Sequence, residues 1–439
     1  MYHEVITRNR QVSTTDRQSE HSTIRVRSVP MSDRKEASTT TRPGLSRSRS
    51  GLSRRGFLKG ALAGAGAISF GSYEAVAQMV GGPSVRGWGV PPGLVRIDSN
   101  ENALGPSPRA VEAVLSLVTS INRYGQNPDL LGKLARRHGV PVVEWTDSPF
   151  APVPGAWIAV GAGSSDLLFA IGHAYVREGT EVVESLPGFG FITRFAGVAN
   201  AEPVRVPLLE GMKPDLDGLS AAVTDRTAMV VVTTPGNPTG QLTPMSQLRP
   251  FVESIPERVL VLVDEAYIEF AENEADREGA ASLVADHPNV IVTRTFSKVF
   301  GMAGMRVGYA VAQPDVIERI GRHRANTLTL LSTHAASAAL DDTSHLGRSQ
   351  ELVSRGKRYF YEQLDAMGIE YAPSESSFVM MNMKTDVDEL VRRLREEHSV
   401  LVGNARARWN IEGWIRVTAG LPEENEAFIA ALKKVLVSS

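Results

Sequence analysis

Lys298 lies in the segment Thr295-Phe296-Ser297-Lys298, whose side chains can hold an anion and attack a carbonyl group. A lysine becomes a Schiff-base nucleophile when its surroundings lower its pKa. The hydroxyl groups of Thr295 and Ser297, with Arg306 further along the chain, are suited to surround a phosphate. On this segment alone a solvent-exposed lysine is the alternative, because most lysines are exposed.

Asp264 ends the apolar run Val261-Leu262-Val263 and is followed by Glu265-Ala266-Tyr267. A carboxylate at the end of a buried strand is costly unless a cation or an N–H group pairs with it, and a ligand can supply that partner. A buried aspartate that caps a neighbouring helix is the alternative, and it explains this segment equally well.

Two turns present further polar groups. Thr234-Pro235-Gly236-Asn237-Pro238-Thr239-Gly240 holds an asparagine between two prolines, which fix the turn and present the amide. Gly161-Ala162-Gly163-Ser164-Ser165-Asp166 leads into a helix, and the N–H groups at such a helix start bind anions, typically phosphate. Either turn alone is also compatible with a loop that binds no ligand.

The elements around these segments predict an α/β fold with a mostly parallel sheet. Short runs rich in Val and Ile alternate with amphipathic stretches such as 166–176 and 244–254, which indicates helices on both faces of the sheet. Ligands in such sheets bind beyond the carboxyl ends of the strands, where all four polar segments lie. After about residue 312 the pattern becomes mainly helical, which predicts a smaller α+β domain. The predicted strands are Trp157–Val160, Glu181–Glu184, Ala228–Thr233, Val259–Asp264, Val290–Thr295 and Val307–Val311.

Taken together, the four segments meet the needs of pyridoxal 5′-phosphate (PLP). This cofactor requires a Schiff-base lysine, an acid beside its pyridinium nitrogen, donors for its ring oxygen and a phosphate cradle. Asp264 would keep the ring nitrogen protonated. Lys298, once displaced by a substrate amine, would act as a general base on the proton of the substrate α-carbon.

From about Arg96 to the C-terminus the sequence resembles the fold-type I aminotransferases of class I/II, and most of all the histidinol-phosphate aminotransferase group. The resemblance implies a PLP-dependent transferase fold, a homodimer, a 2-oxo acid acceptor, and an amino acid or amino-alcohol phosphate as donor. The segments that carry it are Ser99–Pro108, Asn122-Arg123-Tyr124, Asp264–Phe270, the motif around Lys298, Trp414–Gly420 and Pro422–Asn425.

The resemblance also implies roles for single residues. Lys298, Asp264 and Tyr267 are the implied catalytic residues. Lys298 forms the Schiff base and Asp264 pairs with the ring nitrogen. Asn237 and Tyr267 hydrogen-bond the ring oxygen, and Phe189 stacks on the ring.

The remaining implied residues bind phosphate or substrate. Arg416 binds the substrate α-carboxylate or the group in its place, and Asn102 also contacts the substrate. The residues implied to hold the cofactor phosphate are Ser164, Ser165, Thr295, Ser297, Arg306 and, from the other subunit, Tyr124.

Three positions depart from the pattern of this group. Gly236 replaces an asparagine, and Phe189 replaces a tyrosine but keeps a stacking surface. Gly403 stands where the group commonly has an arginine near the substrate phosphate. Arg406 and Arg408 are both candidates to replace that arginine.

The first 77 residues differ in charge from the rest. They carry 13 Lys+Arg and 6 Asp+Glu, whereas the other 362 residues carry 34 and 43. Residues 1–52 are predicted to be disordered. Residues 53–77 contain Ser53-Arg54-Arg55-Gly56-Phe57-Leu58-Lys59, a short apolar run and Ala75-Val76-Ala77, the order of a twin-arginine export signal. The alternative is a basic tail in which Arg-Arg occurs by chance.

An export signal predicts a periplasmic protein and the twin-arginine export machinery as a partner. Its apolar run is too short for a stable membrane anchor. The rest of the chain is predicted to divide into an N-terminal arm with part of the small domain (78–123), a large domain (124–320) and a small domain (321–439).

Composition excludes several other classes. The chain has no cysteine, which excludes disulfides and thiolate metal sites, and its 9 histidines show no metal-binding spacing. The acidic body argues against nucleic-acid binding. Two functions besides transamination stay open: a PLP-dependent lyase such as a phosphoamino-acid decarboxylase, and a non-catalytic PLP-binding protein. The intact Lys298, Asp264 and Arg416 count against the non-catalytic protein.

Overall fold

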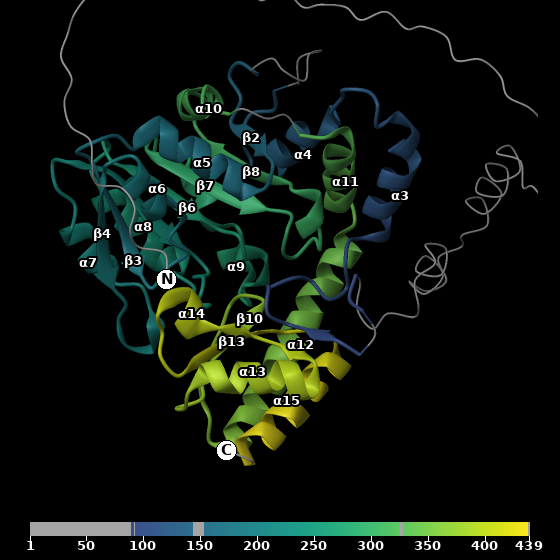
Figure 1. Cartoon of the computed structure of the whole chain (residues 1–439). Helices are drawn as coiled ribbons and strands as arrows, with labels where there is room; N and C mark the ends of the chain where they lie inside the picture. Colours follow the sequence, from purple (N-terminus) through teal and green to yellow (C-terminus); the bar gives the residue numbers. More distant parts are fainter. Residues whose placement is uncertain (1–88, 92, 144–152, 325–327, 438–439) are drawn as a thin grey trace, which may run out of the picture. The chain divides into compact units, whose positions relative to one another are not determined.

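The computed structural model describes residues 89–91, 93–143, 153–324 and 328–437 (Figure 1). The predicted disordered tail (1–52) and export signal (53–77) lie outside these ranges, so both stay predictions. Within the described ranges, no helix combines the length and the apolar character needed to cross a bilayer.

A seven-stranded sheet forms the centre of the larger part of the fold. Its strand order is β2-β8-β7-β6-β5-β3-β4, and the pairs are parallel except those of β8, which runs antiparallel to both neighbours. The prediction of a mostly parallel sheet is therefore confirmed. The strands are β2 Ile158–Gly161, β3 Glu181–Leu186, β4 Glu202–Pro207, β5 Thr227–Thr233, β6 Leu260–Asp264, β7 Val290–Thr295 and β8 Gly308–Ala312.

All six predicted strands form, with ends within two residues of the prediction, but β4 was not predicted. Its sequence, Glu-Pro-Val-Arg-Val-Pro, alternates apolar and polar residues between two prolines. Such a strand is tolerated at an edge, because a proline there removes no ladder hydrogen bond that the sheet needs. β4 is the edge strand next to β3.

Helices cover both faces of this sheet (Figure 1). Val182 and Leu262 belong to one apolar cluster with α5, α6 and α10, whereas Val183 and Val263 belong to another cluster that includes α4 and α8. Strands buried on both faces have continuous apolar sequences, which is why they were recognisable. The helices of this part are α4 Asp129–Arg137, α5 Ser164–Tyr175, α6 Phe191–Val198, α7 Leu216–Ala221, α8 Met245–Ser254, α9 Glu274–Arg277 and α10 Pro314–Gly321.

The C-terminal part contains a four-stranded antiparallel sheet in the order β12-β13-β10-β9. Helices α12, α13 and α15 pack beside it, and β1 pairs in parallel with β11, so the start of the described chain joins this part. Its elements are β1 Val95–Arg96, β9 Glu370–Ala372, β10 Phe378–Asn382, β11 Val400–Leu401, β12 Gly403–Asn404, β13 Trp414–Thr418, α12 Thr343–Met367, α13 Val387–His398, α14 Ala405–Trp409 and α15 Pro422–Val437.

Two helices far apart in the sequence connect these parts. α3 (Pro108–Leu117) packs along α11 (Leu330–Leu340), and the Ser107 hydroxyl caps α3 by accepting a hydrogen bond from the Ala110 N–H. The predicted domain boundaries at 123/124 and 320/321 stay predictions.

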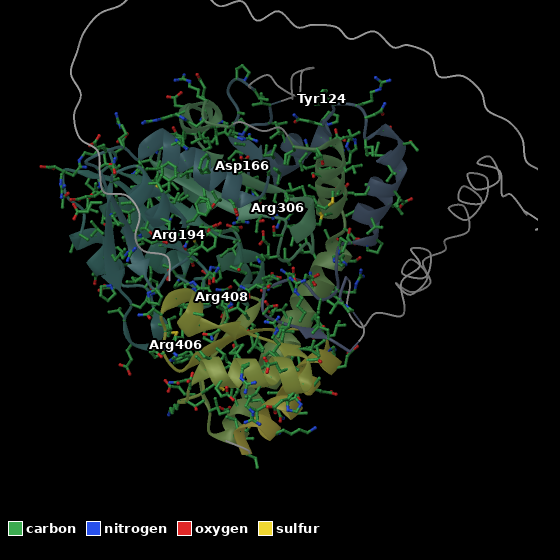
Figure 2. The ribbon with its side chains drawn as sticks, viewed as in Figure 1. Tyr124, Asp166, Arg194, Arg306, Arg406 and Arg408 are labelled. Carbon is green, nitrogen blue, oxygen red and sulfur yellow. The ribbon has the colours of Figure 1, made fainter. Side chains whose placement is uncertain are left out.

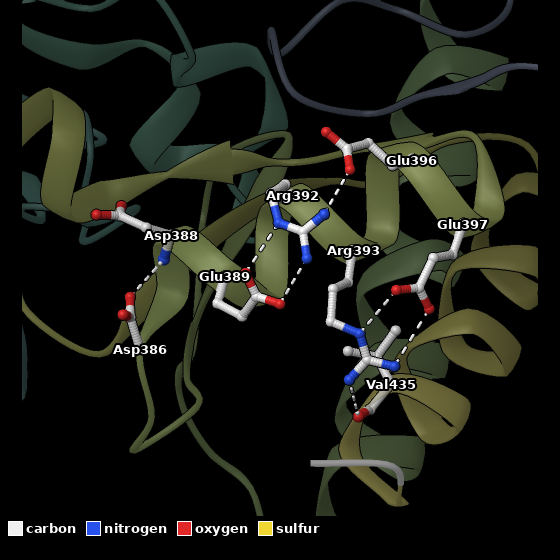
Figure 3. Close-up of polar contacts among 8 residues, drawn as sticks. All are labelled: Asp386, Asp388, Glu389, Arg392, Arg393, Glu396, Glu397 and Val435. Carbon is white, nitrogen blue, oxygen red and sulfur yellow. Dashed lines mark hydrogen bonds and ion pairs between the residues drawn. The ribbon is translucent and has the colours of Figure 1, made fainter.

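The exposed face of α13 is ion-paired within the helix (Figure 3). Arg392 donates to Glu389 and Glu396, and Arg393 donates to Glu397 and to the carbonyl of Val435. Arg392 therefore belongs to a solvated helix surface, whereas Arg393, with 16% of its side chain exposed, connects α13 to α15.

Candidate active site

The carboxyl ends of β2, β5, β6 and β7 lie along one edge of the central sheet, and each carries one of the four polar segments. Asp264 is the last residue of β6, and Lys298 follows β7. Asn237 lies in the turn after β5, and Ser164 begins α5 after β2. The fold therefore brings together residues that are up to 134 positions apart in the chain.

Lys298 is partly buried and is held by uncharged acceptors. Its Nζ donates to the carbonyl oxygens of Asn100 at 3.1 Å and Ser99 at 3.4 Å. The same nitrogen lies 5.5 Å from the centre of the Tyr267 ring. The alternative of a solvent-exposed lysine is therefore wrong. The amine is instead positioned beside the end of β6 by the segment that precedes α3.

Asp264 is buried, with 4% of its surface exposed. The Thr293 hydroxyl donates to its Oδ1 at 2.9 Å. The pKa of Asp264 is raised to about 7, mainly by burial; the Thr293 hydrogen bond lowers it, and the charges of Glu265 and Glu184 add to the increase. Asp264 accepts no side-chain hydrogen bond that would cap a neighbouring helix, so the capping alternative is also wrong among the described residues.

Tyr267 is buried, and its hydroxyl has one defined partner. The Asn100 side-chain amide donates to the Tyr267 Oη at 2.9 Å. Asn100 has a positive φ of 55°, and its own N–H donates to the Thr418 hydroxyl at 3.0 Å. With its oxygen accepting from Asn100, the Tyr267 hydroxyl keeps its proton to donate to a ligand oxygen.

The start of α5 forms a tight backbone cradle. Gly163 precedes the helix at a φ of 81°, in the region that favours glycine. The first N–H groups of the helix, including those of Ser164 and Ser165, have no acceptor within it and suit an anion. A Cβ at Gly163 would overlap the Arg306 guanidinium, and one at Gly308 would overlap the backbone of Ser164. The two glycines thus leave room for the cradle.

The predicted hydroxyl and guanidinium donors meet at this cradle. The Thr295 hydroxyl donates to Ser297 Oγ at 3.0 Å, and both residues are buried. Arg306 Nη1 lies 3.4 Å from Ser297 Oγ and donates to the Ala303 carbonyl at 2.9 Å. Phosphate oxygens accept several such donors at once.

Phe189 lies in the loop between β3 and α6, and a buried carboxylate shapes that loop. Glu184, at 5% exposed, accepts from the Gly190 N–H at 3.0 Å and from the Thr193 hydroxyl at 2.9 Å. Burial raises the pKa of Glu184. The ring of Phe189 lies 6.2 Å from that of Phe191, nearly parallel to it.

Arg416, in β13, is the buried cation of the site. Its guanidinium lies between two aromatic rings, 4.6 Å from the centre of Trp409 and 5.0 Å from that of Phe378. Its Nη1 donates to Asn237 Oδ1 at 2.7 Å. Burial lowers the pKa of Arg416 to about 10, so it is still charged at neutral pH. Its Nε is buried and has no partner among the described residues, so it can still donate to an anion.

The amide of Asn102 is used within the protein. Its Nδ2 donates to the Val299 carbonyl at 2.8 Å and to Ser349 Oγ at 2.9 Å. Its Oδ1 accepts from the Leu104 N–H. Asn102 therefore ties the segment before α3 to the residue after Lys298, and its contact with substrate stays a prediction.

Tyr124 is placed differently from the other predicted site residues. Its side chain is 83% exposed, and Figure 2 shows it apart from Arg306 in the same protomer. Its predicted role in phosphate binding requires a second subunit and stays a prediction.

Several residues that shape the site were not predicted from the sequence. Glu184 carried the same signal as Asp264, an acid at the end of an apolar strand, and that signal was overlooked. Thr293 lies in β7 and contacts Asp264 only because β6 and β7 pair. Asn100 and Trp409 contact the site through tertiary packing, which has no local sequence signal.

Comparison with known proteins identifies the family. Residues 92–432 match the family described as aminotransferase class I and II, and the chain belongs to that family. It is 35% identical over 346 residues to the histidinol-phosphate aminotransferase of Moorella thermoacetica, covering 78% of this chain and 86% of that relative. Identity to the enzyme of the same name from Akkermansia muciniphila is 35% over 350 residues, covering 79% and 91%.

A solved structure agrees with this result. The histidinol-phosphate aminotransferase from Sinorhizobium meliloti in complex with pyridoxal-5′-phosphate is similar with a TM-score of 0.70 at 29% identity, covering 85% of this chain and 96% of that one. The chain is therefore a PLP-dependent transaminase with the fold of the type I enzymes, and both predictions are confirmed.

The residues present fit PLP. The glycine cradle at α5, with Thr295, Ser297 and Arg306, matches a phosphate, and the buried Asp264 lacks a cation that a pyridinium nitrogen supplies. When bound, the cofactor supplies an electron sink for the substrate α-carbon. The protein's part is to hold the cofactor, to orient the substrate and to move protons.

Individual side chains have defined tasks in that chemistry. Asp264 favours a positive charge at the end of β6. Lys298 Nζ, which exchanges its carbonyl acceptors for the reacting centre, carries a proton to and from the substrate α-carbon. Arg416 offers a guanidinium, held beside two aromatic rings, that would orient an anionic group of the substrate.

Asp264→Asn should change how the stability of the cofactor-free protein depends on pH. The pKa of Asp264 is raised from 3.8 to about 7 on folding, so the folded state holds this proton more tightly than the unfolded chain. The stability that protonated Asp264 contributes is therefore lost as pH rises between these two pKa values, and it does not change further at higher pH. Asparagine cannot ionise. As pH rises between 3.8 and about 7, the free energy of unfolding of the variant should therefore increase relative to that of wild type, by up to roughly 1.4 kcal/mol per pH unit.

Urea unfolding at pH 5 and pH 8 measures this difference. Asp225→Asn is the matched control, because Asp225 is fully exposed, and it should follow wild type at both pH values. An Asp264→Asn effect of equal size at the two pH values would contradict the assignment of the raised pKa to Asp264.

Proposed function

We propose that this transaminase takes the amino group of histidinol phosphate, or of a similar amine with an anionic group on its α-carbon, and passes it to a 2-oxo acid. The observation that carries the proposal is the buried guanidinium of Arg416, held between Trp409 and Phe378 with its Nε unused. The names of the relatives from M. thermoacetica and A. muciniphila support the choice of donor.

A single anion site serves both halves of the reaction. Donor and acceptor each present an anionic group beside the carbon that reacts, so Arg416 can orient them in turn. The two substrates would then react one after the other, in a ping-pong sequence.

The proposed enzyme is a homodimer. Tyr124 is 83% exposed, and two neighbouring apolar side chains are also exposed in one protomer, Leu115 at 62% and Ile121 at 66%. A second copy that covers this surface would bring its Tyr124 within reach of the other cradle, which agrees with the role that the sequence predicts.

The protein is also proposed to be exported through the twin-arginine pathway. Residues 53–77 carry the order of such a signal, and the family match begins only at residue 92. This pathway transports folded proteins, which suits an enzyme that needs its cofactor before export.

Histidinol phosphate should convert the cofactor of the full-length protein. In an absorbance titration, we expect the yellow band of the bound cofactor to give way to the band of its amino form, with histidinol phosphate and with L-glutamate as parallel donors. Lys298→Ala should show no such conversion, because the proton-carrying amine is gone. Because histidinol phosphate has no carboxyl group, the lyase would instead be indicated by carbon dioxide release from L-glutamate without an amino form.

Ile121→Asp should separate the proposed dimer. A buried charge at an apolar interface is costly, so we expect sedimentation velocity to give twice the 47.5 kDa chain mass for wild type and a single chain for the variant. Val198→Asp is the control, because Val198 is 84% exposed at the end of α6 and should leave the dimer intact. A monomeric and active wild type would exclude a shared site.

Replacing both Arg54 and Arg55 by lysine should keep the protein in the cytoplasm, because the paired arginines define the signal. Cell fractionation in a bacterial host with the twin-arginine pathway measures this, with wild type in a strain that lacks the transporter as the control. Equal amounts of wild type in the periplasm of both strains would argue for another route.

A further inference from the structure

A side chain at position 403 would be crowded against Arg416. Gly403 in β12 lies directly opposite Arg416 in β13. A Cβ at Gly403 would lie 3.0 Å from the Arg416 carbonyl oxygen, 3.4 Å from its Cβ and 3.6 Å from the carbonyl oxygen of Asp98. The first contact is with backbone, which cannot move without shifting the strand pair. Gly403 is therefore part of how the two strands pack.

Arg408 lies in α14, and its guanidinium approaches the Asp98 carbonyl oxygen, as a Cβ at Gly403 would. Its Nη1 donates to the Asp98 carbonyl oxygen at 3.2 Å. Arg416 Nη2 donates to the same oxygen, also at 3.2 Å. Two guanidinium groups therefore meet at one acceptor, and the positive charge of Arg408 contributes to the lowered pKa of Arg416.

Arg406 is held elsewhere. Its guanidinium pairs with Asp388 at 2.7 Å and with Glu412 at 3.2 Å, and Asp386 lies 3.8 Å away. Figure 2 shows Arg408 on the side of the small domain that faces Arg306, with Arg406 further from it. Of the two residues that could replace the arginine missing at position 403, Arg408 is therefore the one that the structure favours.

Three guanidinium groups and two carboxylates gather around Asp98. The Asp98 carboxylate lies 3.6 Å from Arg408 and 3.7 Å from Arg96, and Arg96 is also 3.6 Å from Glu101. Arg416 contacts Asp98 through its backbone carbonyl oxygen. Arg408 remains 42% exposed and can turn toward a ligand.

We propose that Arg408 is a specificity-determining residue, which gives the second guanidinium beside Arg416 and selects donors whose α-substituent is a phosphate monoester. The inference rests on the proposed function for its substrate class. A phosphate dianion can accept charged hydrogen bonds from both guanidinium groups. An uncharged hydroxyl group in the same position does not require either of them.

Matched amines test the proposal on the full-length holoenzyme. Histidinol phosphate and histidinol differ only in the phosphate. Isothermal titration calorimetry of each with the amino form of the holoenzyme, which cannot take an amino group from an amine, gives a phosphate preference without turnover. Arg408→Gln should weaken binding of histidinol phosphate by about 10- to 100-fold, the range expected for one charged hydrogen bond, and leave histidinol almost unchanged. Arg408→Lys should recover part of the preference, and Arg406→Gln, with the same loss of charge on α14, should behave as wild type.

The outcomes separate this inference from the proposed function. A wild type without a phosphate preference, or an Arg408→Gln variant that keeps it, overturns the role of Arg408. So does an equal loss for both amines, since that would indicate a general disturbance of the site. If wild type prefers the phosphate and Arg408→Gln does not, but no donor converts the cofactor band, the role of Arg408 stands and the proposed transamination of this donor fails.

Discussion

A buried carboxylate without a cation beside it is the constraint on which this site depends. Asp264 and Glu265 follow each other at the end of β6, and both are buried. Arg294 is bound to Glu265 at 2.8 Å, whereas among the described residues the side chain of Asp264 has the Thr293 hydroxyl as its only hydrogen-bond partner. The neighbouring ion pair is complete within the protein and stabilises the strand end. Asp264 has no such cation among the described residues. A pyridinium nitrogen would supply the positive charge, close to Lys298.

The second requirement is that distant parts of the chain meet above this strand end, and the segment before α3 makes that connection. Asn100 contacts Tyr267 through its side chain, Lys298 through its carbonyl and Thr418 through its N–H. The carbonyl of Asp98 accepts from Arg416. A few residues thus tie the central sheet to the C-terminal sheet. Because β1 also pairs with β11, the position of this segment is set by both parts of the fold.

The sequence predicted the central strands and most of the cofactor residues for one physical reason. Strands buried on both faces are apolar along their whole length, so a polar residue at their carboxyl end, such as Asp264, stands out. β4 lacked this signal because it is an edge strand. Asn100 lacked it too, because its contact with Tyr267 joins segments 167 positions apart. Trp409 lacked it because its contact with Arg416 depends on how α14 packs against β13. Only the family resemblance pointed to Arg416, whose own segment reads as an ordinary strand.

The two arginines at the substrate side are held in ways that suit different tasks. Arg416 is buried between two rings and bound to Asn237, so its geometry is fixed before a substrate arrives. An anchor of this kind serves any anionic substrate, which a reaction with two different substrates requires. Arg408 is half-exposed and held only by Asp98, so it can adjust to the larger phosphate group. Gly403 favours this division, because the strand pairing that holds Arg416 leaves little space for a side chain at position 403.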